Sequence, residues 1–205
     1  MIGVVDYGVG NIQAFLNLFK RIGVEAVRAD KVDKLDDAQR LVLPGVGHFD
    51  HAMQKLNDSG LRSRLEQLVL EDSIPILGIC VGMQMLATSS DEGILPGLNW
   101  LPGHVRSFEG NTQCSGLPMP HMGWNILHPR PCYKLFSKGF NESPEFYFLH
   151  SYYFDSLDSE YVSATASCGF EFDAAVSCGH IHGVQFHPEK SHHWGEQLIK
   201  NFVEL

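Results

Sequence analysis

The segment from Pro75 to Leu86 limits what this chain can fold into more than any other part of it. An apolar run, Pro75-Ile76-Leu77-Gly78-Ile79, leads into Cys80, and Val81-Gly82-Met83-Gln84-Met85-Leu86 follows at once. The run predicts a buried strand and the following residues predict a helix, with only Cys80 between them. Glycines stand two positions before and two positions after Cys80, where a side chain would collide with neighbouring backbone in so sharp a turn. The pattern therefore predicts a strand–helix elbow with a thiol raised above the edge of a sheet.

Two interpretations of Cys80 fit this segment equally well. At the N-terminus of a helix, free amides and the positive end of the helix dipole favour the thiolate, which is the nucleophilic form of cysteine. A cysteine that is only a small apolar residue at the end of a buried strand would have the same neighbours. Residues elsewhere in the chain decide between the two.

Alternating strands and helices predict the fold around this elbow. In the first half, strands are expected at 2–5, 24–28 and 41–43, and helices at 12–22, from about 49 and at 61–70. This order indicates a parallel sheet with helices on both faces. Shorter strands are expected in the second half, at 100–108, 123–127, 146–150, 161–166, 174–177 and 181–186, before a final helix near 194–203. We expect an α/β fold, a three-layer sandwich with a central, mostly parallel sheet, in a single domain over residues 1–205.

Composition argues against several classes of function. The net charge of -9, with no basic cluster, disfavours nucleic-acid binding. The five cysteines are scattered and form no CxxC pair, which favours free thiols in a reducing compartment. The chain opens on an apolar strand and reaches Asp6 at once, so we expect no signal peptide, no membrane span and a cytoplasmic location. The spacings of His180, His182, His192 and His193 suit metal ligation, but no carboxylate set accompanies them, so we expect no metal and no cofactor.

The second informative pattern is the segment Gly183-Val184-Gln185-Phe186-His187-Pro188-Glu189-Lys190. Pro188 stops the apolar strand before it, and His187 and Glu189 are two positions apart, so their side chains point the same way in an extended chain. A carboxylate beside an imidazole fixes its tautomer and stabilises its charged form, which suits a partner for a thiol. Standing alone, this pair would be read as a surface histidine near an incidental glutamate. Together with the cysteine elbow, it predicts a base and its orienting acid.

The third pattern is Pro44-Gly45-Val46-Gly47, at the end of a predicted parallel strand. Parallel sheets place their ligand sites at that edge. An ordinary turn would look similar, but glycines there let backbone N–H groups turn inward and, with the amide of Val81, stabilise a developing oxyanion. A nucleophile, a base and oxyanion donors at one sheet edge predict acyl transfer through a thioester.

These motifs, in this order and spacing, resemble those of the triad-type (class I) glutamine amidotransferases. Within that family the chain is most similar to the glutaminase subunits of imidazole glycerol phosphate synthase. The resemblance runs from the first residues to the last helix. The motifs that narrow it are Asp6-Tyr7-Gly8-Val9-Gly10-Asn11, Pro120-His121-Met122-Gly123-Trp124-Asn125 and Phe148-Leu149-His150-Ser151-Tyr152.

The resemblance implies a role for each matching residue. Cys80 would attack the carboxamide of glutamine, His187 would protonate the departing ammonia and then activate water, and Glu189 would hold His187 in place. Backbone amides of Val46, Gly47 and Val81 would form the oxyanion hole, with the peptide at Val46 reorienting to complete it. The residues implied to hold glutamine are Gln84, Glu92, Ser151 and Tyr152.

The resemblance also implies a partner. The glutaminase would dock as a heterodimer on the mouth of a (β/α)₈ cyclase/synthase barrel, through which the ammonia travels, and the isolated chain would have low activity. The alternative for apolar and aromatic docking residues is ordinary core packing, and for Lys190 a solvated side chain. The positions that match the docking surface are Asn11, Met122, Trp124, Tyr147 and Lys190.

Two features depart from the histidine-pathway pattern. Ala14 stands where a polar residue facing the synthase is common, and Ser191-His192-His193-Trp194-Gly195 is bulkier than expected. Both flank the expected docking surface, so a paralogous synthase that amidates a sugar in surface-polysaccharide synthesis is a second hypothesis for the partner. A non-catalytic interaction module, or a cysteine hydrolase or peptidase on a related elbow fold, is the alternative from another class.

Overall fold

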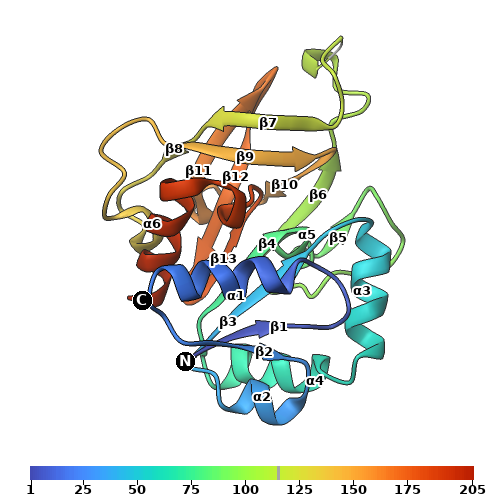
Figure 1. The fold of residues 1–205 in the computed structure, drawn as a ribbon. Helices are drawn as coiled ribbons and strands as arrows, with labels where there is room; N and C mark the ends of the chain where they lie inside the picture. Colours follow the sequence, from blue (N-terminus) through green and yellow to red (C-terminus); the bar gives the residue numbers. More distant parts are fainter. Residues whose placement is uncertain (115) are drawn as a thin grey trace.

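A mixed sheet of 11 strands forms the centre of the protein, described by a computed structural model over residues 1–114 and 116–205 (Figure 1). Its strands are β1 (Ile2–Val5), β2 (Ala26–Ala29), β3 (Arg40–Gly45), β4 (Ile76–Cys80), β5 (Ser89–Ser90), β6 (Gly103–Ser107), β8 (His128–Pro129), β10 (Tyr152–Ser156), β11 (Val162–Cys168), β12 (Phe170–Cys178) and β13 (Ile181–Val184). They lie in the order β2-β1-β3-β4-β13-β12-β10-β6-β5, with β11 paired to β12 and β8 paired to β11.

Helices pack on both sides of the parallel part of this sheet, which runs from β2 to β13. Figure 1 shows α1 on one side of β1, and α2 with α4 on the other. In α1, the buried positions Ile12, Phe15 and Phe19 recur at helical spacing and form the face that packs on the core. The helices are α1 (Ile12–Arg21), α2 (Val32–Asp36), α3 (Phe49–Asp58), α4 (Arg62–Glu66), α5 (Val81–Gln84) and α6 (His192–Val203), with a π-helical turn at Gln67–Glu71.

Three neighbouring parallel strands end at the same edge of the sheet. Gly45, at the end of β3, lies in register with Cys80 at the end of β4. On the other side of β4, Val184 at the end of β13 lies beside Ile79. All of β4 and β13 is buried, as expected for strands that are covered on both faces. The three segments whose sequences predicted catalytic chemistry therefore lie side by side at this edge of the sheet.

The second half of the chain adds an antiparallel layer and a small second sheet. Strands β12, β10 and β6 continue the central sheet in antiparallel pairs. The second sheet pairs β7 (His121–Ile126) with β9 (Glu145–His150), and both cross in front of the central sheet in Figure 1. Its inner face is buried at Phe146 and Phe148, whereas Met122 and Trp124 on its outer face are exposed. This alternation is typical of an antiparallel sheet with one side on the core.

The predicted α/β class and the strand–helix elbow are confirmed, but some local predictions were wrong. The helix after Cys80 ends at Gln84, whereas the sequence favoured a longer one. It ends early because the carbonyls of Met85 and Leu86 accept hydrogen bonds from Leu98 and Trp100 rather than from a continuing helix. Strand β10 was not predicted. In the part of the chain that the structure covers, no helix is long and apolar enough to cross a membrane.

Candidate active site

The elbow at Cys80 joins β4 to α5 through a strained backbone. Cys80 has φ 55° and ψ -113°, a region that a residue with a side chain rarely occupies. A Cβ atom added to Gly78 would lie 2.6 Å from the carbonyl oxygen of Gly82, and one added to Gly82 would overlap the carbonyl oxygen of Leu43. Both glycines are therefore required by backbone that approaches within contact distance, as the sequence predicted.

The Cys80 thiol is buried but lines a cavity. The side chain is 4% exposed, and Sγ lies 3.9 Å from the carbonyl oxygen of Leu149, to which the S–H can donate. On another side, the amide nitrogen of Gln185 lies 3.7 Å from Sγ and can donate to the sulfur. Cys80 is thus held between β9 and the end of β13.

His187 is fixed in place by its backbone and by its ring. Its backbone N–H donates to the carbonyl of Tyr147 at 2.9 Å, and its own carbonyl accepts from the Ser191 hydroxyl at 2.6 Å. The ring Nδ1 lies 2.9 Å from Oε1 of Glu189, and the two side chains are only 6% and 4% exposed. The alternative of a surface histidine is therefore excluded, and the pairing that the two-residue spacing predicted is present.

Burial and charge act in opposite directions on the His187 imidazole. Burial disfavours the charged ring, but interactions with Cys80 and with the Glu189 carboxylate favour it more strongly and raise the pKa of His187 to about 9. At neutral pH the ring is therefore charged. That is the form that stabilises a neighbouring thiolate and can donate a proton to a departing amine.

We expect Glu189→Gln to lower the pKa of His187, because it removes the carboxylate charge and keeps a similar shape. The titration midpoint of the His187 ring, followed by NMR of its nitrogens, should fall by about 1 to 3 pH units. Because the pKa of His187 is higher in the folded than in the unfolded state, the charged ring stabilises the fold. This contribution is complete below about pH 6.5, the pKa of histidine in the unfolded state. That contribution is lost as the pH rises through about 9. The free energy of unfolding should therefore decrease over this interval in the wild type and less in the variant.

The exposed Glu142 provides the matched control for this prediction. Glu142→Gln removes the same charge from a surface position, so it should leave the His187 midpoint unchanged. An unaltered midpoint in Glu189→Gln would mean that the carboxylate does not set the charge state of the ring.

The turn expected to supply oxyanion donors lies beside the thiol. Val46 is 44% exposed and Gly47 has φ +81°, and both line the cavity at Cys80, as does Val81. Sequence reasoning missed Tyr7, whose hydroxyl donates to the carbonyl of Pro44 at 2.7 Å. Burial, and the proximity of Cys80, raise the pKa of Tyr7, so its hydroxyl keeps its proton. Tyr7 therefore holds the start of this turn in place through its hydrogen bond to Pro44.

One cavity of about 290 Å³ collects the predicted catalytic, oxyanion-hole and glutamine-binding residues except Glu189, together with Lys190 of the predicted partner surface. Its volume is near the lower end of the range for small-molecule sites, about 300 to 1,000 Å³. Glu189 stands behind His187, outside the lining. The cavity is lined by Val46, Gly47, Cys80, Val81, Gln84, Glu92, Pro120, Leu149, His150, Ser151, Tyr152, His187 and Lys190.

The residues expected to hold glutamine are themselves held by hydrogen bonds. The Gln84 amide nitrogen donates to the carbonyl of Tyr152 at 3.2 Å and to Oε1 of Gln185 at 3.0 Å. Glu92 accepts from the backbone N–H of Phe49 at 2.7 Å through one carboxylate oxygen. Gln185 and His150 were not predicted as site residues. Both lie in motifs that were noted, but only their approach to Cys80 and Tyr152 reveals them.

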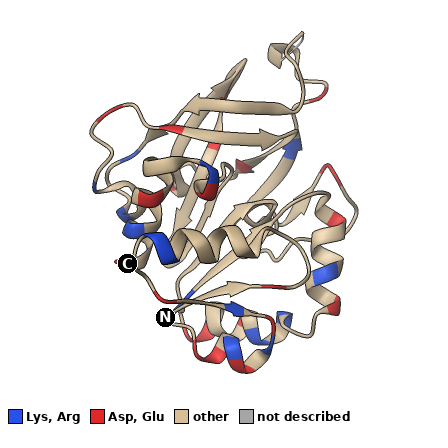
Figure 2. Ribbon diagram, in the orientation of Figure 1, with Lys and Arg blue, Asp and Glu red and all other residues tan. Residues whose placement is uncertain are grey.

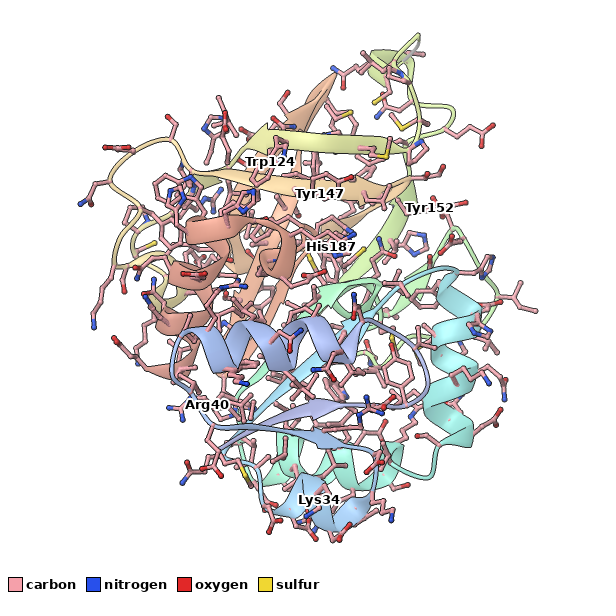
Figure 3. All side chains as sticks on the ribbon, viewed as in Figure 1. Lys34, Arg40, Trp124, Tyr147, Tyr152 and His187 are labelled. Atoms are coloured by element: carbon pink, nitrogen blue, oxygen red, sulfur yellow. The ribbon has the colours of Figure 1, made fainter. Side chains whose placement is uncertain are left out.

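The residues expected at the partner surface lie mainly around the outer face of β7 and β9. Met122 and Trp124 are 64% and 47% exposed, so the alternative that they are core residues is wrong. The Lys190 ammonium lies 5.4 Å from the ring centroid of Tyr147, and the Tyr147 ring packs edge-on against Trp124. Figure 3 labels Trp124 on β7 and Tyr147 on β9 beside it. Asn11 is exposed and caps α1 by accepting from the N–H of Ala14.

The histidines that were considered as metal ligands have other partners. His180 contacts the carbonyl of Val69 at 2.6 Å, and His182 contacts the Ser177 hydroxyl at 2.9 Å. His192 stacks on Trp124 with ring centroids 5.2 Å apart. Over residues 1–114 and 116–205, no group of three or more histidine, cysteine, aspartate or glutamate side chains is arranged to hold a metal ion.

Comparison with known proteins agrees with this geometry. The family model described as glutamine amidotransferase class-I matches residues 3–205. The imidazole glycerol phosphate synthase subunit HisH of Bdellovibrio bacteriovorus is 54% identical over 205 residues, and HisH 2 of Pseudomonas aeruginosa is 45% identical; each alignment covers 100% of both chains. A crystal structure of a glutamine amidotransferase shares the fold, with a TM-score of 0.75 at 21% identity over 99% of this chain and 97% of that one. The chain belongs to the class-I glutamine amidotransferase family.

Proposed function

We propose that this protein is a glutaminase subunit that hydrolyses L-glutamine to glutamate and ammonia and passes the ammonia to a (β/α)₈ synthase subunit, that of imidazole glycerol phosphate synthase. The observation that carries the proposal is one small cavity holding the Cys80 thiol and the His187–Glu189 pair. The names of the full-length relatives support the choice of synthase. The five free thiols support a cytoplasmic location.

The reaction follows from the charge state of the cavity. The Cys80 sulfur attacks the carboxamide carbon of glutamine, and the C–N bond breaks as the charged His187 ring donates its proton to the departing ammonia. A γ-glutamyl thioester remains. The neutral ring, oriented by Glu189, then takes a proton from water, whose oxygen attacks the thioester carbon. The C–S bond breaks and leaves the Cys80 thiolate beside the recharged ring, and the released γ-carboxyl group of glutamate loses its proton to solvent. The protein ends in its starting state.

The surrounding residues supply charge stabilisation and substrate positioning. Backbone amides of Val46, Gly47 and Val81 would donate to the oxygen that becomes negative in each tetrahedral intermediate. Glu92, whose carboxylate lines the cavity, would face the ammonium group of glutamine, and Gln84 with the Ser151–Tyr152 backbone would hold its amino-acid end. These assignments are supported by the shared cavity lining.

The outer face of β7 and β9 is the surface that we assign to the synthase. It is apolar and aromatic apart from Glu145 at the start of β9, and β7 contains no charged residue. It continues through Tyr147 and Lys190 into the cavity. Figure 2 shows charged positions on the ribbon of α2, α3, α4 and α6 and at the end of α1, but none on β7. An exposed apolar face rimmed by polar residues is typical of a protein interface.

The test measures glutamate release with and without partner. Alone, the chain should hydrolyse glutamine slowly; with the imidazole glycerol phosphate synthase barrel subunit and its nucleotide substrate, the rate should rise by at least about 100-fold if docking completes the oxyanion hole. Trp124→Ala should weaken this activation by raising the partner Kd about 30-fold or more, as for an interface hot spot. Leu157→Ala, which truncates an exposed leucine outside this face, is the control.

The same assay distinguishes the two candidate synthase partners. His192 has a positive φ of 48° and stacks on Trp124, so the bulky segment that departs from the histidine-pathway pattern lies on the proposed docking face. If a sugar-amidating barrel activates the chain and the imidazole glycerol phosphate synthase barrel does not, the sugar-amidating synthase is the partner. High turnover without any partner would contradict the docking model, and no turnover with either barrel would contradict the enzyme assignment.

A further inference from the structure

Three polar side chains form a continuous hydrogen-bonded chain behind the proposed glutamine site. His150 Nδ1 lies 2.8 Å from the carbonyl oxygen of Tyr152, and His150 Nε2 lies 2.9 Å from His121 Nδ1. His121 Nε2 lies 3.1 Å from the amide nitrogen of Asn125, which also donates to the carbonyl of Ser167 at 2.7 Å. The chain thus runs from the cavity wall through the inner face of the β7–β9 sheet to β11.

The position of each proton in this chain follows from its two ends. The carbonyl of Tyr152 can only accept, so His150 carries its proton on Nδ1 and leaves Nε2 bare. His121 must then carry its proton on Nδ1, and its bare Nε2 accepts from Asn125. Because the Ser167 carbonyl can only accept, the end of the Asn125 amide that faces it and His121 must be the nitrogen and not the oxygen. From Asn125 to His150, the three donors therefore point toward Tyr152, whereas the second amide hydrogen of Asn125 points to the Ser167 carbonyl.

Among the residues that the structure describes, the two rings have no further hydrogen-bond partner, and their burial disfavours the charged form. His150 is 6% exposed among aromatic rings, with Phe108 and Phe172 each at 5.3 Å between ring centroids. Burial lowers the pKa of His150 to about 3 and also lowers the pKa of His121. His121 stacks on Phe148 and pairs directly across the sheet with His150. A neutral pair with fixed tautomers is the state that this packing requires.

The hydrogen-bonded chain of side chains ends at the backbone of Tyr152, which lines the cavity. The Tyr152 carbonyl accepts both from His150 and from the Gln84 amide, so one oxygen ties together two elements of the proposed glutamine site. The contact from His150 to Tyr152 spans two residues and closes a turn over Ser151. At the other end of this turn, the Leu149 carbonyl faces the Cys80 thiol. In the opposite tautomer, a bare His150 nitrogen would face the Tyr152 carbonyl and repel it.

We propose that His121 and Asn125 are positioning residues for glutamine binding: they hold His150 in its Nδ1–H tautomer and so place the Ser151–Tyr152 backbone and the Gln84 amide. Neither residue lines the cavity, so both act through His150. The inference rests on the proposed glutaminase function. It adds a second role to β7, whose outer face carries Met122 and Trp124 while its inner face carries this chain.

The test compares matched variants at His121 in the partner-bound protein. His121→Phe keeps the ring shape but removes the donor to His150, and it should raise the KM for glutamine about tenfold, the effect of one buried acceptor left unpaired. The kcat should stay within about twofold, because Cys80 and His187 are untouched. His121→Asn places an N–H where Nδ1 lies, so it should restore KM to within about threefold of wild type. NMR of the His150 ring nitrogens should show a single Nδ1–H tautomer in the wild type and a mixture in His121→Phe.

Two outcomes would overturn the inference: an unchanged KM in His121→Phe, or a wild-type His150 that carries its proton on Nε2. A merely structural role would lower the melting temperature and the amount of active protein without raising KM, and His121→Asn would then give no rescue. If His121→Phe does not fold, Asn125→Leu replaces it, with an expected threefold rise in KM, of the order of one weakened hydrogen bond. A wild-type complex that releases no glutamate would refute the proposed function instead, and the NMR tautomer would still decide the hydrogen-bond assignment.

Discussion

Replacing Cys80 with alanine is expected to reduce glutamate release from the partner-bound protein by about 10⁴-fold or more, the usual loss when a covalent nucleophile is removed. No other described side chain in the cavity should take over the attack, because none of them stands on the elbow between β4 and α5 that presents Cys80. Apart from His187, the other lining residues with nucleophilic groups are Glu92, His150, Ser151, Tyr152 and Lys190. The fold should be retained, since the thiol occupies little volume in a cavity wall. Glutamate release is measured by a coupled assay, and folding by the circular dichroism spectrum.

Cys132 gives the matched control for this substitution. It is an exposed free cysteine, so Cys132→Ala should leave the rate unchanged. A diazo-ketone analogue of glutamine should label the wild type at Cys80, free glutamine should block the labelling, and Cys80→Ala should not react. Equal glutamate release from wild type and Cys80→Ala would refute the nucleophile assignment. Labelling that glutamine does not block would point to a different hydrolase.

Replacing Gly82 with alanine is expected to cost about 3 kcal/mol or more in the free energy of unfolding, at the upper end for overpacked sites. The added Cβ would overlap the carbonyl oxygen of Leu43 in the neighbouring strand. Backbone atoms cannot rotate away as a side chain can, so β3 and α5 would have to separate. Chemical denaturation measures the loss, and the displaced elbow should also abolish glutaminase activity.

Gly23 distinguishes this steric cost from a cost of backbone conformation. It ends α1 with φ +75°, and a Cβ there would meet nothing within 4 Å. Gly23→Ala should therefore cost only the strain of a left-handed alanine, about 1 to 2 kcal/mol. If Gly82→Ala is no more destabilising than Gly23→Ala, the close approach of β3 and α5 does not define the elbow.

Much of the candidate site could be predicted because its chemistry is encoded over short stretches. Gly78, Cys80 and Gly82 specify the elbow by their spacing alone, since the collisions they avoid are with backbone rather than with particular side chains. The pairing of His187 with Glu189 was predicted from their two-residue spacing in an extended segment. In the structure Pro188–Lys190 forms a 3-10 turn instead, and this turn brings the Glu189 carboxylate to the His187 ring. The alternation of strand and helix predicts that all three patterns meet at one sheet edge.

Other parts of the site depend on contacts between distant segments. Tyr7 reaches Pro44 across 37 positions, and Gln84 reaches Gln185 across 101. The early end of α5 depends on Leu98 and Trp100, more than ten positions further along the chain, whose N–H groups donate to the carbonyls of the two residues that follow the helix. Local propensity contains no information about such partners, so the sequence favoured a longer helix and did not identify these side chains.

The order of residues was enough to determine that Cys80 stands on an elbow, that His187 and Glu189 pair, and that the chain has the α/β class. These features rest on local sterics and on periodicity, which act the same way in any tertiary context. Only the folded structure decided that Trp124 and Met122 face outward, and that His121, Asn125 and His150 join into one hydrogen-bonded chain beneath Tyr152. Exposure and hydrogen-bond direction depend on what the other strands leave uncovered or unpaired, and that is settled only when the two sheets pack together.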